Sequence, residues 1–187
     1  SEMCIRDSLR PNHVSLLGFL WALLASVAYW RWSSHFLVAF SAPLLVLFSG
    51  YSDALDGLMA RLYGLESRAG AMLDSFLDRY ADAAIIIGVW AGGLCGPLPA
   101  LLALSGSLLV SYARARAEGL GVDLKGIGLA ERAERLLIIM IASWVSLFLW
   151  GPALEISMLI LVFLTHLTAA QRAAYAFRVL RASASSS

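Results

Sequence analysis

Residues 53–61 of this chain read DALDGLMAR, and they are followed by Gly70, Asp74 and Asp78. The stretch places four aspartates in a sequence that is 60% hydrophobic and only 14% charged. A charge held away from water is costly unless a partner compensates it. We therefore predict that these four aspartates form a functional site.

The spacing of the aspartates predicts two antiparallel helices. Asp53 and Asp56 are three residues apart and share one face of a helix, and Asp74 and Asp78 are four apart and share a face of the next. Residues 62–69, between the two pairs, contain a glycine and several polar side chains, which is typical of a chain reversal. The reversal directs four carboxylates into one small volume.

Such a group of carboxylates calls for cations. Two carboxylates ~4 Å apart repel each other by about 4 kcal/mol at an effective dielectric constant of 20. Ligands that are all oxygen suit hard metals, Mg²⁺ or Mn²⁺ before Zn²⁺, and no Cys or His lies nearby. Two divalent cations would neutralise the four negative charges, so we predict a two-metal centre made of Asp53, Asp56, Asp74 and Asp78.

The composition of the whole chain predicts an integral membrane protein. Mean hydropathy is +0.76, and a spanning helix needs about 20 mostly apolar residues. Six segments qualify, at residues 12–32, 35–62, 69–93, 97–117, 129–150 and 153–180. The predicted fold class is therefore all-α, a bundle of six transmembrane helices. Residues 11–181 form one transmembrane domain, residues 1–10 a leader that is truncated or non-native, and residues 182–187 a disordered tail.

The basic residues predict the orientation. Of the fourteen Lys and Arg residues, only Arg31 falls on the far side of the predicted bundle. The positive-inside rule then places both termini and the carboxylates at the cytoplasmic face of the cell membrane. Cys4 and Cys95 are far apart, so we expect neither a disulfide nor a metal site from them.

The pattern D-x2-D-G-x2-A-R-x8-G-x3-D-x3-D over residues 53–78 resembles the signature of the CDP-alcohol phosphotransferases. The resemblance implies transfer of a substituted phosphate from a CDP-linked donor to an alcohol, with release of CMP. It also implies a homodimer with two divalent cations in a cavity that faces the cytoplasm.

The resemblance assigns a role to each position of the signature. Asp53, Asp56 and Asp74 would hold metal, and Asp78 would share the second metal and act as general base. The residues implied in nucleotide binding are Asp56, Gly57, Ala60, Arg61, Ser67 and Gly70. Gly57 and Ala60 have an alternative interpretation as packing contacts between helices in lipid.

A second group of charged residues suggests the acceptor alcohol. Arginines recur in residues 111–118, 131–135 and 171–172, and their forked side chains match a phosphate monoester better than a neutral alcohol. These runs are similar to the inositol-phosphate-using branch of the family, which implies that Arg114, Arg132, Arg135 and Arg172 bind the acceptor phosphate. Alternatively, Arg114, Arg116 and Arg132 form interfacial ion pairs with Glu118, Glu131 and Glu134, or anchor lipid headgroups.

The sequence thus predicts a membrane enzyme that transfers a phosphatidyl-type group from a CDP-linked lipid to inositol phosphate. Its expected partners are the lipid donor, a phosphorylated alcohol, the bilayer and a second copy of the chain, with no nucleic acid. Glycerol 3-phosphate as the acceptor and CDP-inositol as a soluble donor are alternatives. A cation transporter is a further alternative, which the one-sided placement of the aspartates disfavours.

Overall fold

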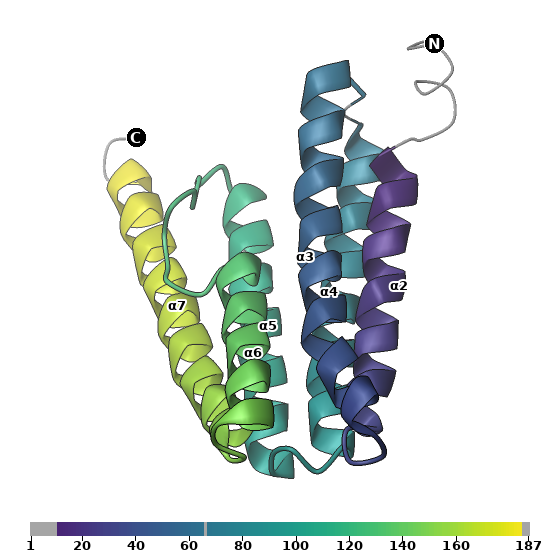
Figure 1. Ribbon diagram of the computed structural model, residues 1–187. Coiled ribbons are helices and arrows are strands. Elements are labelled where there is room, and N and C mark those ends of the chain that lie inside the picture. The colour runs from purple at the N-terminus through teal and green to yellow at the C-terminus, as the bar shows by residue number, and fades with distance from the viewer. Residues whose placement is uncertain (1–10, 66, 185–187) are drawn as a thin grey trace, which may run out of the picture.

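The computed structural model describes residues 11–65 and 67–184. Within this part of the chain all regular structure is helical, as predicted (Figure 1). The helices are α2 (Pro11–Trp30), α3 (Phe36–Tyr63), α4 (Arg68–Ala91), α5 (Pro97–Glu118), α6 (Arg132–Phe148) and α7 (Ala153–Ala184). The predicted leader and Cys4 lie outside the described residues, and α7 extends to Ala184, into the segment predicted as a tail.

The reversal between α3 and α4 forms for local reasons. Gly64 ends α3 in the left-handed conformation, with φ 62°, which a residue without Cβ adopts at little cost, and its N–H donates to Ala60 O. Ser67 then caps α4, because its Oγ accepts a hydrogen bond from Gly70 N at 3.0 Å. The two caps thus end α3 and begin α4 within a few residues of each other.

The helices of the described residues form two groups, α2–α4 and α5–α7, which lie side by side (Figure 1). In one group α2 packs against both α3 and α4, and in the other α7 packs against both α5 and α6. Contacts of α3 with α6 and of α4 with α5 join the groups. Small residues allow the close approaches: a Cβ on Gly88 of α4 would lie 2.6 Å from Ser26 Cα, and one on Gly106 of α5 would lie 2.1 Å from Thr165 Oγ1.

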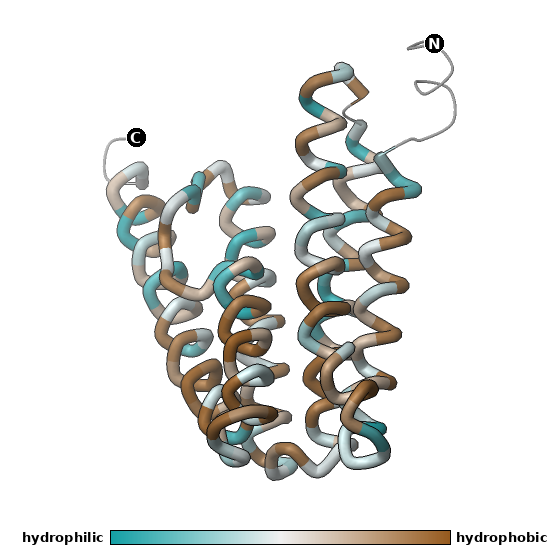
Figure 2. Tube along the Cα trace, in the orientation of Figure 1, coloured by the Kyte–Doolittle hydropathy of each residue, from teal (hydrophilic) through white to brown (hydrophobic). Residues whose placement is uncertain are grey.

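The surface of the bundle is that of a membrane protein. Large apolar side chains are exposed along the helices, among them Leu16, Leu101 and Leu159. Figure 2 shows hydrophilic residues gathered at the end of the bundle where α2 begins and α7 ends. Four helices, α2, α3, α5 and α7, are long and apolar enough to cross a membrane. Of the other two, α4 carries charged residues from Arg68 to Asp82 and α6 is only 17 residues long.

Candidate active site

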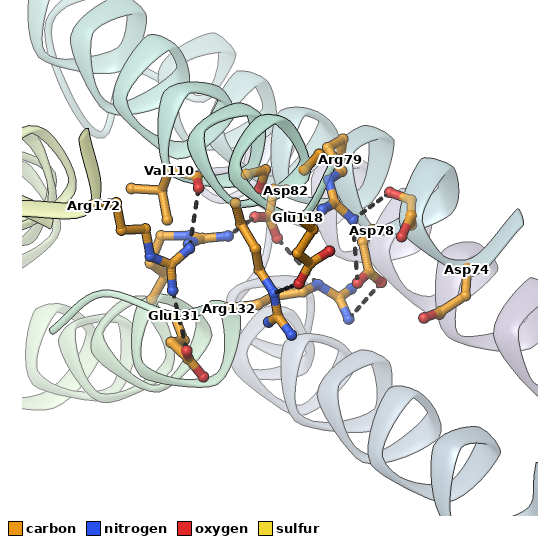
Figure 3. A pocket seen from close by; sticks show the side chains of 14 residues that line it. Asp74, Asp78, Arg79, Asp82, Val110, Glu118, Glu131, Arg132 and Arg172 are labelled. Carbon is orange, nitrogen blue, oxygen red and sulfur yellow. Dashed lines mark hydrogen bonds and ion pairs between the residues drawn. The ribbon is translucent and has the colours of Figure 1, made fainter. Parts of the chain in front are cut away.

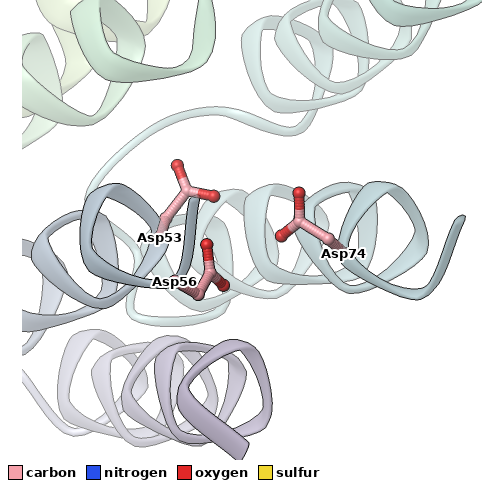
Figure 4. A group of neighbouring side chains, drawn as sticks. All are labelled: Asp53, Asp56 and Asp74. Carbon is pink, nitrogen blue, oxygen red and sulfur yellow. The ribbon is translucent and has the colours of Figure 1, made fainter. Parts of the chain in front are cut away.

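Three of the four predicted carboxylates meet between α3 and α4. Oxygen atoms of Asp53, Asp56 and Asp74 all lie within 4.8 Å of one another (Figure 4). Asp56 is buried and the other two are half-buried. Three carboxylates at this separation repel each other and offer only oxygen ligands, so the group fits a hard divalent cation such as Mg²⁺ or Mn²⁺.

Asp78 lies one turn further along α4, beside this group rather than within it. Arg132, at the start of α6, joins the two parts of the site. Its Nη1 lies 2.9 Å from Asp53 Oδ2 and 2.8 Å from Asp78 Oδ1. Asp78 therefore lies outside the group of three whose oxygens come within 4.8 Å of one another, but all four predicted carboxylates line one small cavity together with Arg132.

Asp56 is held by a residue that the sequence analysis did not identify. Ser15 of α2 donates a hydrogen bond to Asp56 Oδ2 at 2.5 Å, and it also bonds to Pro11 O in its own helix. Ser15 begins a line of small buried residues on α2 that continues through Gly18 and Ala22. That spacing could have indicated that Ser15 faces α3.

All six predicted nucleotide-binding residues line one cavity of about 470 Å³, here called the nucleotide cavity. Its wall also includes Asp74 and, from the start of α2, Pro11 and Asn12. A Cβ on Gly57 would contact only the Arg61 side chain, at 3.8 Å, so no neighbouring helix requires a glycine there. Open space at Gly57 favours the approach of a ligand over the alternative of helix packing.

All four predicted acceptor-binding arginines line a second cavity of about 320 Å³, here called the arginine cavity (Figure 3). Asp74 lines both cavities, whereas Asp78 lines the arginine cavity and is not among the residues of the nucleotide cavity. The aspartates therefore stand where the two cavities meet. This arrangement can bring two ligands to one set of carboxylates from different sides.

The arginines are held in different ways. Arg172 is buried and clamps the α5–α6 connection: its Nε donates to Ile127 O at 2.8 Å, its Nη1 to Val110 O at 3.0 Å and its Nη2 to Glu131 at 3.1 Å. Arg114 forms an exposed ion pair with Glu118 at 2.9 Å, as the alternative interpretation proposed. Arg132 instead pairs with the aspartates.

Arg135 has a partner that the sequence analysis missed. Its Nη2 donates to Asp82 Oδ2 at 2.5 Å and its Nη1 to Ala130 O at 2.8 Å. Asp82 also accepts from Arg132 Nε at 3.3 Å. The signal in the sequence was that Asp82 follows Asp78 by four residues, on the same face of α4.

Comparison with known proteins agrees with this geometry. Residues 9–178 match the model of the CDP-alcohol phosphatidyltransferase family. The chain is 40% identical to an archaetidylinositol phosphate synthase of Methanothermobacter thermautotrophicus, over 94% of this chain and 87% of that protein. It is 38% identical to the synthase of the same name from Pyrococcus horikoshii, over 88% of this chain and 81% of that protein.

Solved structures agree as well. The crystal structure of a phosphatidylinositol phosphate synthase from Mycobacterium tuberculosis, in complex with manganese and citrate, superposes with a TM-score of 0.79. It is 31% identical, and the match covers 94% of this chain and 86% of that one. A second structure of that enzyme, with CDP-DAG bound, has the same TM-score over 94% and 90% of the two chains. The chain described here therefore belongs to the CDP-alcohol phosphatidyltransferase family.

Proposed function

We propose that this protein transfers a phosphatidyl-type group from a CDP-linked lipid to inositol phosphate and releases CMP. One observation carries the proposal: a single set of aspartates lies between a cavity lined by the nucleotide signature and a cavity lined by four arginines. A cavity with that many guanidinium groups suits an acceptor that carries its own phosphate. The names of the relatives support inositol phosphate over glycerol 3-phosphate.

The donor nucleotide occupies the nucleotide cavity. Gly57, Ala60 and Gly70 line this cavity, and the missing Cβ of Gly57 leaves room for the nucleotide against the backbone of α3. Arg61 contacts the diphosphate, and Ser67 lies near the nucleotide at the opening of α4. The relative crystallised with CDP-DAG supports this assignment.

The metal centre uses the aspartates between the cavities. Asp53, Asp56 and Asp74 hold divalent cation, Asp78 shares a second ion, and Mg²⁺ or Mn²⁺ fits these oxygen ligands. Divalent cation bound there draws negative charge from the diphosphate and stabilises CMP as the leaving group. The manganese in the crystallised relative supports this choice of metal.

The acceptor occupies the arginine cavity, where Arg114, Arg132, Arg135 and Arg172 bind its phosphate. Asp78, which lines that cavity, takes the proton from the attacking hydroxyl. The hydroxyl oxygen forms a bond to the lipid-side phosphorus, and the bond from that phosphorus to the CMP oxygen breaks. The proton ends on Asp78 and the electron pair leaves with CMP.

We further propose that all six helices span the cell membrane and that both termini and the active site face the cytoplasm. An even number of alternating helices puts the start of α2 and the end of α7 at the same end of the bundle (Figure 1). The signature aspartates lie in the second half of α3 and the first half of α4, which are the halves nearer that end. Trp30, Trp90 and Trp150 lie at or just beyond the opposite ends of α2, α4 and α6, where an aromatic belt is expected. Residues 11–181 act as one catalytic domain, and assembly as a homodimer is proposed from the family resemblance.

The experiment is a measurement of CMP release by purified protein. The assay contains Mg²⁺ or Mn²⁺, a CDP-linked lipid, and either inositol 1-phosphate or glycerol 3-phosphate. Because the two archaeal relatives named above are archaetidylinositol phosphate synthases, both diacyl and ether forms of the lipid are included. CMP released only with inositol phosphate supports the proposal. CMP released only with glycerol 3-phosphate would show that the proposed acceptor is wrong and that the proposed donor is right.

A further inference from the structure

Asp82 is a buried carboxylate that belongs neither to the metal group nor to the family signature. It is 8% exposed and lies on α4 one turn beyond Asp78. Each of its oxygens takes a different arginine: Oδ1 accepts from Arg132 Nε and Oδ2 from Arg135 Nη2 (Figure 3). One carboxylate thus fixes the orientation of two guanidinium groups.

We propose that Asp82 is a positioning residue for the acceptor phosphate, acting through Arg132 and Arg135. The inference rests on the proposed function. Two arginines three residues apart on α6 repel each other, and without an anion between them their side chains would separate. Asp82 holds them side by side at the wall of the arginine cavity before any acceptor arrives, so that less side-chain entropy is lost on binding.

The place of Asp82 in the fold supports a role in the cavity. The main packing partners of α4 are α2 and α5, and those of α6 are α3 and α7. The ion pairs of Asp82 therefore cross a space between two helices that are not main packing partners, and that space is the arginine cavity. A carboxylate that served only to join two helices would be expected at a main packing contact.

Neutralising Asp82 should change the affinity for the acceptor phosphate in opposite directions, depending on whether electrostatics or positioning dominates. Asp82 lowers the positive potential of the arginine cavity, so its neutralisation by itself would strengthen the attraction of a phosphate. Loss of the fixed arginine geometry would weaken binding instead. An asparagine is the sharpest probe, because its amide offers one oxygen to accept from one arginine and directs an NH₂ at the other.

The experiment measures binding of inositol 1-phosphate to the purified full-length protein by titration calorimetry in Mg²⁺, and KM and kcat from CMP release. The variants are Asp82→Asn, Asp82→Glu, Arg135→Ala and the double variant Asp82→Asn with Arg135→Ala. We expect Asp82→Asn to weaken acceptor binding and raise its KM by about 10- to 100-fold, with a smaller change in kcat and in the KM of the CDP-lipid. Asp82→Glu, which keeps the carboxylate, should weaken acceptor binding less than Asp82→Asn does.

The double variant tests whether Asp82 acts through Arg135. If it does, adding Asp82→Asn to Arg135→Ala should raise the acceptor KM by much less than it does in the wild type. Tyr29→Phe is the matched control for lost stability, because it removes a buried hydrogen bond, to Ser143 at 2.6 Å, outside the two cavities. It should lower the unfolding temperature and leave the acceptor KM unchanged.

Three results would overturn the inference: an acceptor KM for Asp82→Asn that is unchanged or lower, effects that add fully in the double variant, or a Tyr29→Phe protein whose acceptor KM rises as much. Failure of the proposed function looks different. In that case the wild-type protein itself neither binds inositol 1-phosphate nor releases CMP with it, and the inference falls along with the function.

Discussion

Arg132 forms ion pairs with aspartates on both sides of the site, in the metal group and in the arginine cavity. Its Nη1 contacts Asp53 and Asp78, and its Nε contacts Asp82. A single half-buried guanidinium therefore offsets part of the repulsion among three carboxylates. It also contacts both Asp78, the proposed base, and Asp53 of the metal group, and so links the two.

Asp78→Asn is the test of the general base. The variant should lose turnover by about 10²- to 10⁴-fold, because an amide cannot take a proton from the acceptor hydroxyl. Binding of the CDP-lipid should remain largely intact, because Asp78 is not among the residues that line the nucleotide cavity. CMP release and equilibrium binding of the CDP-lipid measure the two effects.

Asp123→Asn is the matched control for that variant, since Asp123 is exposed in the α5–α6 connection, where it accepts a hydrogen bond from Lys125 N at 2.8 Å. It should behave as the wild type does. Equal loss of turnover and of lipid binding in Asp78→Asn would assign Asp78 to metal binding alone.

Arg135→Ala tests the acceptor phosphate site. Removal of one charge-assisted hydrogen bond to the phosphate should raise the acceptor KM by the equivalent of about 2 kcal/mol, or roughly 30-fold. Arg116→Ala is the control, because Arg116 is exposed near the same end of the bundle and is not among the residues of the arginine cavity. An unchanged acceptor KM in Arg135→Ala would contradict the proposal that the arginine cavity binds the acceptor phosphate.

At the residue scale, the sequence predicted charges better than the polar residues that support them. The aspartates and arginines were identifiable because each is costly in an apolar chain. Ser15 and Asn12 were not, because small polar residues in a membrane helix also serve as ordinary packing contacts. Asp82 was missed because the signature ends at Asp78, although helical spacing placed both on one face.

At the element scale, the caps of α3 and α4 were predictable and the start of α6 was not. Gly64 and Ser67 carry local signals for ending one helix and beginning the next. The sequence predicted the fifth span from residue 129, but α6 begins at Arg132. One tertiary and one local contact engage the preceding residues: Leu129 N donates to Thr168 Oγ1 at 3.1 Å, and Ala130 O accepts from the Arg135 side chain.

Gly106→Val tests the packing of α5 against α7. A Cβ at this position would lie 2.1 Å from Thr165 Oγ1 and 2.9 Å from His166 Nδ1, so the helices must separate to admit it. We expect a loss of about 1–3 kcal/mol in the free energy of unfolding, measured as a lower midpoint in detergent. The acceptor KM should rise too, since α5 and α7 carry Arg114 and Arg172.

Gly151→Val is the control for that variant, because an added Cβ there would meet nothing within 4 Å. Its unfolding midpoint should stay close to that of the wild type. Equal midpoints for the two variants would contradict the close approach of α5 and α7.

At the scale of the whole molecule, the six helices of residues 11–65 and 67–184 were predictable from the sequence and their arrangement was not. The apolar runs marked each helix within a few residues. The grouping into α2–α4 and α5–α7 was hidden, because helix faces that contact lipid and faces that contact protein are both apolar. Hydrophobic periodicity, which orients the helices of a water-soluble protein, therefore carried little information.

Paired cysteines test the proposed orientation of the molecule. In a background with Cys4 and Cys95 replaced by alanine, Ser33→Cys lies in the exposed α2–α3 connection and Asp123→Cys in the α5–α6 connection at the other end. A membrane-impermeant thiol reagent applied to intact cells should label the first and spare the second, and cell disruption should expose both. Labelling of Asp123→Cys in intact cells would show that the protein has the opposite orientation in the membrane.

The position of Asp74 in the walls of both cavities has a stereochemical consequence. Donor and acceptor that approach the same carboxylates from different sides can be bound together, so the proposed transfer needs no covalent intermediate on the protein. A hydroxyl that attacks from the arginine cavity meets the phosphorus on the face opposite the departing CMP. The proposed transfer is then a single displacement through a ternary complex, with inversion of configuration at phosphorus.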